Sequence, residues 1–222
     1  MTYSEKCHND LDALFASMSA GRPAHEDVIR FRSVFNAANK CDFLLRLFKA
    51  RAVQTGRFTL ASGKESTYYI NSKKAIFNSE AAWLIGDVLY DLAKDLNVQA
   101  IGGLEIGAIP MATAAAMRFH EEGKSVEAFF VRKQAKGHGS QDRLEGGLKA
   151  GDRVAVVEDV MTTGGSVLQA VEEVEKAGAK VVLLTCIVDR LEGAREKLGG
   201  KYNYQPIFTI RDFGIEPPTK EE

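Results

Sequence analysis

The sequence predicts an α/β fold with a central, mostly parallel sheet flanked by helices. From about residue 79 onward, short apolar runs rich in β-branched residues alternate with helical patterns of apolar residues. Such alternation is typical of parallel strands joined by crossover helices. The uncharged run at residues 154–157 is typical of a strand buried on both faces. Of the 222 residues 45% are hydrophobic and 27% are charged, which suits a globular domain with its own core.

The chain is predicted to divide into an N-terminal helical extension, residues 1–39, and a main domain, residues 40–222. In the extension, apolar residues recur at helical spacing between residues 11 and 18, and again over residues 25–38. Neither predicted helix carries a chemical motif. Both are therefore interpreted as elements that pack on the main domain.

The main domain is expected to begin with a helix from residue 42, followed by a turn-rich segment at residues 56–63 and a short strand at residues 68–71. A helix over residues 79–96 comes next, with Ser79 as its cap. Beyond it, strands are expected at residues 98–103, 126–131, 154–157, 181–188 and 206–210, with helices at residues 108–120, 164–177 and 191–198.

Charge, cysteine content and hydropathy exclude several classes of protein. The net charge of −1 argues against a non-specific nucleic-acid binder, which needs a clustered basic surface. Cys7, Cys41 and Cys186 are far apart and form no CxxC pair, so neither a disulfide framework nor a zinc site is predicted. No apolar segment approaches the length of a transmembrane helix, and the N-terminus has no long apolar stretch. We expect a cytoplasmic protein with no nucleic-acid and no membrane partner.

The strongest chemical signal lies at residues 154–166. The apolar run ends in Glu158 and Asp159, and a turn of small residues leads into a helical pattern. Free backbone N–H groups and the helix dipole at such a turn can bind a phosphate. The acids lie at the carboxyl end of the strand, where open α/β sheets bind ligands, and can accept hydrogen bonds from ribose hydroxyls. A phosphorylated sugar is the predicted ligand. The alternative, an ordinary loop with a capping acid, needs only one such residue.

A long polar loop at residues 132–147 follows a predicted buried strand. It is rich in glycine and has no apolar spacing, as is typical of active-site lids. Its cations can stabilise an anionic ligand away from water. The alternative interpretation is a solvated hairpin with incidental charge. The cationic residues are Arg132, Lys133, Lys136 and His138.

Two further segments give weaker signals. In residues 102–110 a strand ends, glycines let the backbone approach a ligand, and a helix begins near Ala108. Residues 58–69 combine aromatic side chains with hydroxyl groups, and such a combination can form part of a small-molecule site.

Together these segments resemble the type I phosphoribosyltransferases. Residues 154–166 resemble the signature that binds 5-phosphoribosyl 1-diphosphate (PRPP). The Arg-Lys-x-x-Lys-x-His-Gly pattern at residues 132–139 resembles the catalytic loop of the orotate phosphoribosyltransferases. Residues 102–110 are similar to the family's diphosphate loop, and residues 58–69 to its hood over the base. The resemblance covers residues 42–215 and implies the family fold with a small hood.

The resemblance implies transfer of ribose 5-phosphate from PRPP to orotate, giving orotidine 5′-monophosphate and diphosphate in pyrimidine biosynthesis. It implies catalytic roles for Lys136, His138, Glu158 and Asp159, and an orotate site at Thr162 and Arg190. By itself, Arg190 is interpreted as a surface or capping residue. The implied PRPP site consists of Arg132, Lys133, Lys136, His138, Glu158, Asp159, Val160, Met161, Thr162, Thr163, Gly164, Gly165 and Ser166.

The resemblance also implies Mg²⁺, held mainly by PRPP rather than by assigned protein side chains, and a homodimer in which the catalytic loop is shared between subunits. The chain departs from the family where members carry lysines, at Ala61 and Gly107, and where Glu158 replaces an aspartate. Two alternatives stay open: a phosphoribosyltransferase for another base, and a PRPP- or nucleotide-sensing regulator on the same fold. The candidates to replace the missing lysines are Lys64, Lys73 and Lys74.

Overall fold

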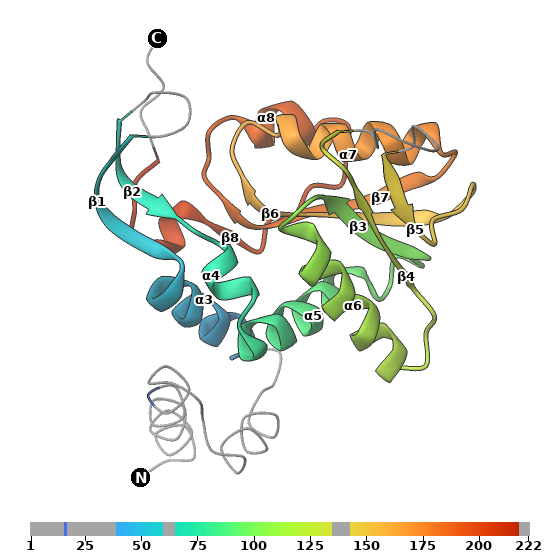
Figure 1. Cartoon of the computed structure of the whole chain (residues 1–222), viewed down its shortest axis with the longest axis horizontal. Coiled ribbons are helices and arrows are strands. Elements are labelled where there is room, and N and C mark those ends of the chain that lie inside the picture. The colour runs from blue at the N-terminus through green and yellow to red at the C-terminus, as the bar shows by residue number, and fades with distance from the viewer. Residues whose placement is uncertain (1–15, 17–38, 60–64, 135–142, 218–222) are drawn as a thin grey trace. The chain divides into compact units, whose positions relative to one another are not determined.

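The computed structural model describes residue 16 and residues 39–59, 65–134 and 143–217 (Figure 1). The chain forms two compact units, residues 1–71 and 72–222, and each is described by itself. Of the predicted extension, residues 1–39, only residues 16 and 39 are among the described residues. The boundary between residues 39 and 40 therefore stays a prediction.

The first unit contains helix α3, Lys40–Arg51, and a hairpin of strands β1, Val53–Thr59, and β2, Glu65–Ile70. Helix α3 buries Phe43, Leu44, Leu47 and Phe48, because apolar residues at this spacing share one helical face. Strand β1 was expected as a turn-rich segment. Pairing with β2 overrides the turn signal at Gly56, whose φ of 153° and the nearby register shift mark a bulge in the ladder.

The second unit is built on a six-stranded sheet in the order β5-β4-β3-β6-β7-β8, and its arrangement confirms the predicted fold class (Figure 1). All neighbouring strands are parallel except β5, which pairs antiparallel with β4. Strand β5 lies within the segment expected to be a loop. The strands are β3, Ala100–Leu104; β4, Glu127–Val131; β5, Leu144–Gly146; β6, Arg153–Met161; β7, Lys180–Asp189; and β8, Phe208–Thr209.

Helices cover both faces of this sheet, with α7 and α8 on one face and α5 and α6 on the other (Figure 1). The cap of α5 is Asn78 rather than the expected Ser79, since the Asn78 side chain accepts a hydrogen bond from the Ala81 N–H. The helices are α4, Lys73–Ile76; α5, Ser79–Ala93; α6, Ala108–Glu121; α7, Gly165–Lys176; α8, Ala194–Leu198; and the 3₁₀ helix η1, Ile210–Phe213. Among the described residues, no helix combines the length and the apolar character needed to cross a membrane.

The centre of the sheet is packed too tightly for side chains at Gly102 and Gly103. A Cβ at Gly103 would collide with the carbonyl oxygen of Val157 on β6, and a Cβ at Gly102 with that of Phe129 on β4. These glycines were expected to let the backbone approach a ligand. They instead let the neighbouring strands approach β3, and so bring the ends of β3 and β6 close together.

Candidate active site

Glu158 and Asp159 lie near the carboxyl end of strand β6, which is longer than predicted. The run at residues 154–157 continues as strand to Met161, because β6 stays in register with β7 as far as the pair Met161 and Asp189. The acids are therefore held by strand hydrogen bonds rather than by a loop. Both carboxylates are largely buried, and the Glu158 side chain contacts the Asp159 backbone N–H.

Asp159 is the ionised member of the pair. Its Oδ2 accepts a short hydrogen bond from the Ser72 hydroxyl and lies 3.7 Å from Lys73 Nζ. Burial alone would raise the pKa of Asp159. Hydrogen bonds from Glu158 and Ser72, together with the charge of Lys73, outweigh burial and lower that pKa. The site therefore presents a fixed negative charge near neutral pH.

Glu158 is the neutral member. Only 7% of the residue is exposed, and its Oε2 has no hydrogen-bond partner among the described residues. Burial, and then the neighbouring Asp159 carboxylate, raise the pKa of Glu158 to about 9. The two acids thus share one proton and carry one negative charge between them, so they are not equivalent.

We expect the stability of the ligand-free protein to decline as the pH rises from about 4.5 to about 9, because of Glu158. Its carboxyl has an ordinary pKa of 4.5 when unfolded and about 9 when folded, so folding takes up a proton in this range. Stability then declines by up to about 1.4 kcal/mol per pH unit. In Glu158→Gln, which stays neutral at every pH, the decline should be smaller. Urea unfolding of both proteins across the range measures the difference, and identical pH profiles would contradict the assignment.

Gly107 ends the loop between β3 and α6 and lies directly against Asp159. A Cβ at this position would collide with the Asp159 carboxylate carbon and lie 2.6 Å from Oδ2. The carboxylate has little room to turn away, since Ser72 and Lys73 hold it. A side chain at residue 107 would therefore require the Asp159 carboxylate to move. Lys73, one of the expected substitutes, reaches the same carboxylate from α4.

Given the catalytic role that the resemblance implies for Asp159, Gly107→Ala should lower turnover by tens of fold, because a displacement of about 1 Å at such a residue can cost about a hundredfold. The new methyl group must push the Asp159 carboxylate out of its position. Steady-state kinetics of the variant gives the effect. Gly200→Ala is the matched control, since a Cβ at Gly200 meets nothing within 4 Å. Equal activity of the two variants would show that the position of Asp159 is not critical.

The phosphate turn, defined here as Thr162–Ser166, joins β6 to α7 as the sequence predicts. Strand β6 ends at Met161 and α7 begins at Gly165, so the first N–H groups of a twelve-residue helix open at the turn. Gly164 has a φ of 80°, and a Cβ added at this position would lie 3.0 Å from the Leu198 side chain. Only glycine suits both restrictions. Thr163, Gly165 and Ser166 are exposed, so the turn can reach an anion from solvent.

The basic loop, residues 132–147, is fastened at its two ends. The Arg132 N–H donates to the Arg143 carbonyl at 2.8 Å, and Arg143 Nε donates back to the Arg132 carbonyl at 2.7 Å. Arg132 Nε also lies 3.0 Å from Glu145 Oε1, and the Lys133 N–H donates to Glu105 Oε1 at 2.8 Å. Arg132 therefore has an ion-pair partner of its own. Lys136 and His138 lie outside the described residues.

Arg190 follows β7 in a turn that its neighbours hold firmly. Its N–H donates to the Met161 carbonyl at 2.9 Å, which ties it to the end of β6. The buried Asp189 carboxylate accepts the Leu191 N–H at 2.8 Å and the Tyr204 hydroxyl at 2.9 Å. Leu191 adopts a left-handed φ of 58°, which delays the start of α8 from the expected residue 191 to Ala194. Arg190 is thus a rigidly placed residue, not a freely solvated one.

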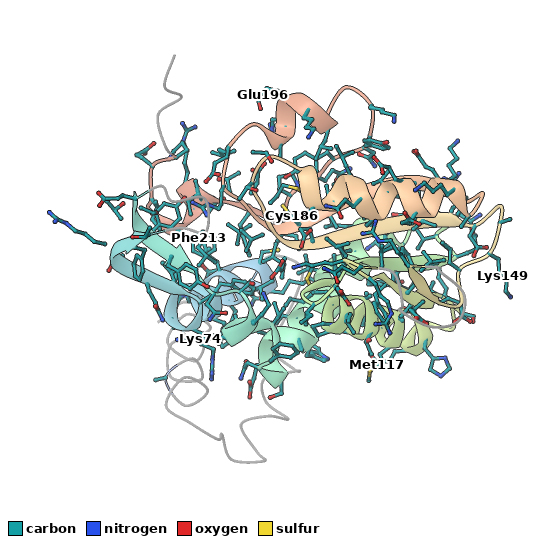
Figure 2. The ribbon with its side chains drawn as sticks, turned by 45° about the horizontal axis from the view of Figure 1, so that its top comes forward. Lys74, Met117, Lys149, Cys186, Glu196 and Phe213 are labelled. Carbon is teal, nitrogen blue, oxygen red and sulfur yellow. The ribbon has the colours of Figure 1, made fainter. Side chains whose placement is uncertain are left out.

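Beneath this turn lies a buried thiol. Cys186 on β7, labelled in Figure 2, has its Sγ 3.3 Å from the Tyr204 hydroxyl. Burial raises the pKa of Cys186 and that of Tyr204, so both remain protonated at neutral pH. Cys186 is therefore a buried small residue that packs against the hydrogen-bonded pair of Tyr204 and Asp189.

The β1–β2 hairpin in the first unit contains a pocket of about 320 Å³. The rings of Phe58 and Tyr69 lie 5.8 Å apart in the same hairpin, so aromatic and hydroxyl groups occur together here as the sequence predicts. Lys64 and Ala61 lie outside the described residues. The pocket is lined by Arg57, Phe58, Thr59, Glu65, Ser66 and Thr67.

The second unit therefore brings together the acid pair, the phosphate turn and Arg190 at the carboxyl ends of β6 and β7. Sequence reasoning missed the residues that hold them. Ser72 was missed, although it lies in a polar run at residues 71–74 that spans the start of α4 and was a usable signal. Glu105 lay inside the predicted diphosphate loop without an assigned role. Asp189 and Tyr204 gave no signal, because a single buried Asp and a single Tyr have no characteristic spacing.

Comparison with known proteins gives consistent matches over this region. Residues 73–222 match the family described as phosphoribosyl transferase domain. The orotate phosphoribosyltransferase of Streptomyces avermitilis is 50% identical over 78% of this chain and 96% of its own length. That of Thermococcus kodakarensis is 43% identical over 77% of this chain and 91% of its own. The crystal structure of the Mycobacterium tuberculosis orotate phosphoribosyltransferase in complex with PRPP matches with a TM-score of 0.67 and 35% identity, covering 80% of this chain and 99% of that one.

Proposed function

The chain belongs to the phosphoribosyl transferase domain family and, within it, to the orotate phosphoribosyltransferases, and from this premise we propose how its residues carry out the reaction. The ribose 5-phosphate of PRPP is transferred to orotate, giving orotidine 5′-monophosphate and diphosphate. The observation that carries the proposal is the ionised Asp159 near the carboxyl end of β6, three residues before Thr162, where the phosphate turn begins. A related enzyme bound to PRPP has the same fold.

The acid pair meets the ribose. The bond between the anomeric carbon and the diphosphate oxygen breaks with its electron pair leaving on diphosphate. The orotate ring nitrogen bonds to the anomeric carbon and gives up its proton, which the anionic diphosphate takes. Positive charge builds on the ribose during this exchange, and the fixed negative charge of Asp159 favours it. Glu158, which keeps its proton, can donate a hydrogen bond to a ribose hydroxyl. The opposite pKa shifts of the two acids support these separate roles.

The phosphate turn and the basic loop take the two anionic ends of PRPP. The N–H groups of the phosphate turn bind the 5-phosphate, with Thr163 and Ser166 exposed beside them. Val160 and Met161 form the strand end that leads into this turn. Lys133, Lys136 and His138 stabilise the departing diphosphate, and Arg132 anchors the loop through Glu145.

Mg²⁺ suits the donor set of the acid pair. Among the described residues no group of three metal-binding side chains exists. Mg²⁺ prefers one or two carboxylates together with substrate phosphate oxygens, and Asp159 offers an ionised carboxylate. When bound, the ion neutralises charge on the diphosphate of PRPP.

Arg190 and Thr162 are the proposed contacts of orotate. A guanidinium pairs well with a carboxylate in the plane of a flat ring, and Arg190 is held in place by the turn around it. Thr162 begins the phosphate turn on the neighbouring strand. The aromatic and hydroxyl groups of the β1–β2 hairpin suit the family's hood over the base. A homodimer with a shared basic loop, and a cytoplasmic location, stay predictions.

The test is the ultraviolet absorbance of orotate with purified protein, PRPP and Mg²⁺. A PRPP-dependent loss of the orotate signal supports the proposal. Turnover with a purine or uracil, but not with orotate, would keep the PRPP site and overturn the choice of base. Tight PRPP binding without turnover of any base would instead favour a PRPP-sensing regulator.

A further inference from the structure

The side chain of Arg190 forms an ion pair with Glu192, an acidic residue that has no role in the proposed reaction. Glu192 lies two residues further along the turn, and its Oε1 is 2.8 Å from Arg190 Nε. The side chains of Arg190 and Glu192 are only 12% and 24% exposed. The pair is therefore largely removed from solvent, and charge–charge interactions between partly buried groups are screened less than those between exposed groups.

The contact between Arg190 and Glu192 acts through charge rather than through an aligned hydrogen bond. Glu192 Oε1 is buried and accepts no hydrogen bond of good geometry within the described residues. A buried guanidinium needs a counter-charge, and removing one partner of a buried ion pair leaves the other charge uncompensated. Glu192 supplies this counter-charge while no substrate is present.

The backbone around this pair has little freedom to respond. Leu191 and Gly193 both have left-handed φ angles, 58° and 105°. Asp189 closes the turn by accepting the Leu191 N–H, and Tyr204 in turn holds Asp189. Because the turn is fixed, the position of the guanidinium depends on side-chain contacts, and the pairing with Glu192 is one of them.

We propose that Glu192 is a positioning residue: it holds the Arg190 guanidinium in place before the base arrives and so sets the affinity for the carboxylate of that base. The inference rests on the proposed function, since it assumes that Arg190 binds the orotate carboxylate. Glu192 itself is not a catalytic residue, because it acts through Arg190. Its effect should appear in the binding of orotate and not in that of PRPP.

Glu192→Ala should raise KM for orotate about tenfold. This is less than the roughly hundredfold loss that a displacement of about 1 Å can cause. KM for PRPP should stay within about twofold, because PRPP contacts lie elsewhere. Glu192→Gln keeps the length and an oxygen acceptor but not the charge, and should restore part of the affinity. Glu172→Ala, an exposed acid on α7, is the matched control for removal of a surface carboxylate.

A double-mutant cycle separates positioning from general damage. If Glu192 acts through Arg190, Glu192→Ala should add little to KM for orotate once Arg190 is also alanine. Independent, additive effects would overturn the proposal. So would a lower KM for orotate in Glu192→Ala, which would make Glu192 a competitor of the substrate, or equal rises in both KM values. Failure of the wild-type protein to turn over orotate would instead overturn the proposed function.

Discussion

Asp159→Asn should reduce turnover by about a thousandfold, near the upper end for loss of one electrostatic contact made to a transition state. The substitution keeps the shape of the side chain and removes its charge. Asp159 is held by Ser72 and Lys73 and stays ionised, so it is the fixed negative charge available to a positively charged ribose. Steady-state kinetics with saturating PRPP and orotate measures the loss.

The loss in Asp159→Asn has to be separated from unfolding. Asp95→Asn changes an exposed aspartate after α5 and should leave turnover unchanged. Thermal unfolding of both variants shows whether the fold survives. Glu158→Gln should cost far less than Asp159→Asn, because Glu158 is already neutral in the folded protein. Equal losses in the two acid variants would show that the acids act alike and would contradict the division of charge between them.

Lys136→Ala should reduce turnover by about 10²–10³-fold, equivalent to about 2.7–4 kcal/mol of transition-state stabilisation, with a much smaller effect on orotate binding. Lys136 is expected to contact the diphosphate as negative charge builds on it, so the contact is stronger in the transition state than in the ground state. Single-turnover kinetics gives the chemical rate, and equilibrium titration gives the affinity for orotate.

Lys149→Ala is the control for Lys136→Ala, because Lys149 is an exposed cation beyond the basic loop, labelled in Figure 2. It changes the net charge equally and should leave turnover intact. Near-normal turnover in Lys136→Ala would contradict the proposed role of the basic loop in the chemical step. A loss confined to KM for PRPP would make the loop a binding element only.

Much of the fold could be predicted because its signals are local. The uncharged run before Glu158 predicts a buried strand, and the small residues after it predict the turn into α7; both are confirmed. The family resemblance, taken from four short segments, is confirmed over most of the chain. Strand β1 was missed because a glycine in a bulge resembles a glycine in a turn.

The arrangement within the site could not be predicted, because it depends on residues distant in sequence. Ser72 and Asp159 are 87 positions apart, and no spacing rule connects them. The adjacent acids give the same sequence signal, yet burial and the contacts of Asp159 shift their pKa values in opposite directions. The glycine at residue 107 is read as a departure from the family, and only the position of the Asp159 carboxylate explains it.

The fastening of the basic loop has a consequence for how such enzymes can diverge. The reciprocal hydrogen bonds between Arg132 and Arg143, and the anchoring of Lys133 by Glu105, fix both ends of the loop independently of the sequence between them. Loop-closure entropy grows slowly with length, by about 0.6 kcal/mol per doubling. Insertions between these anchors should therefore cost little folding free energy. The length of the loop can change in evolution while the acids on β6 stay where they are.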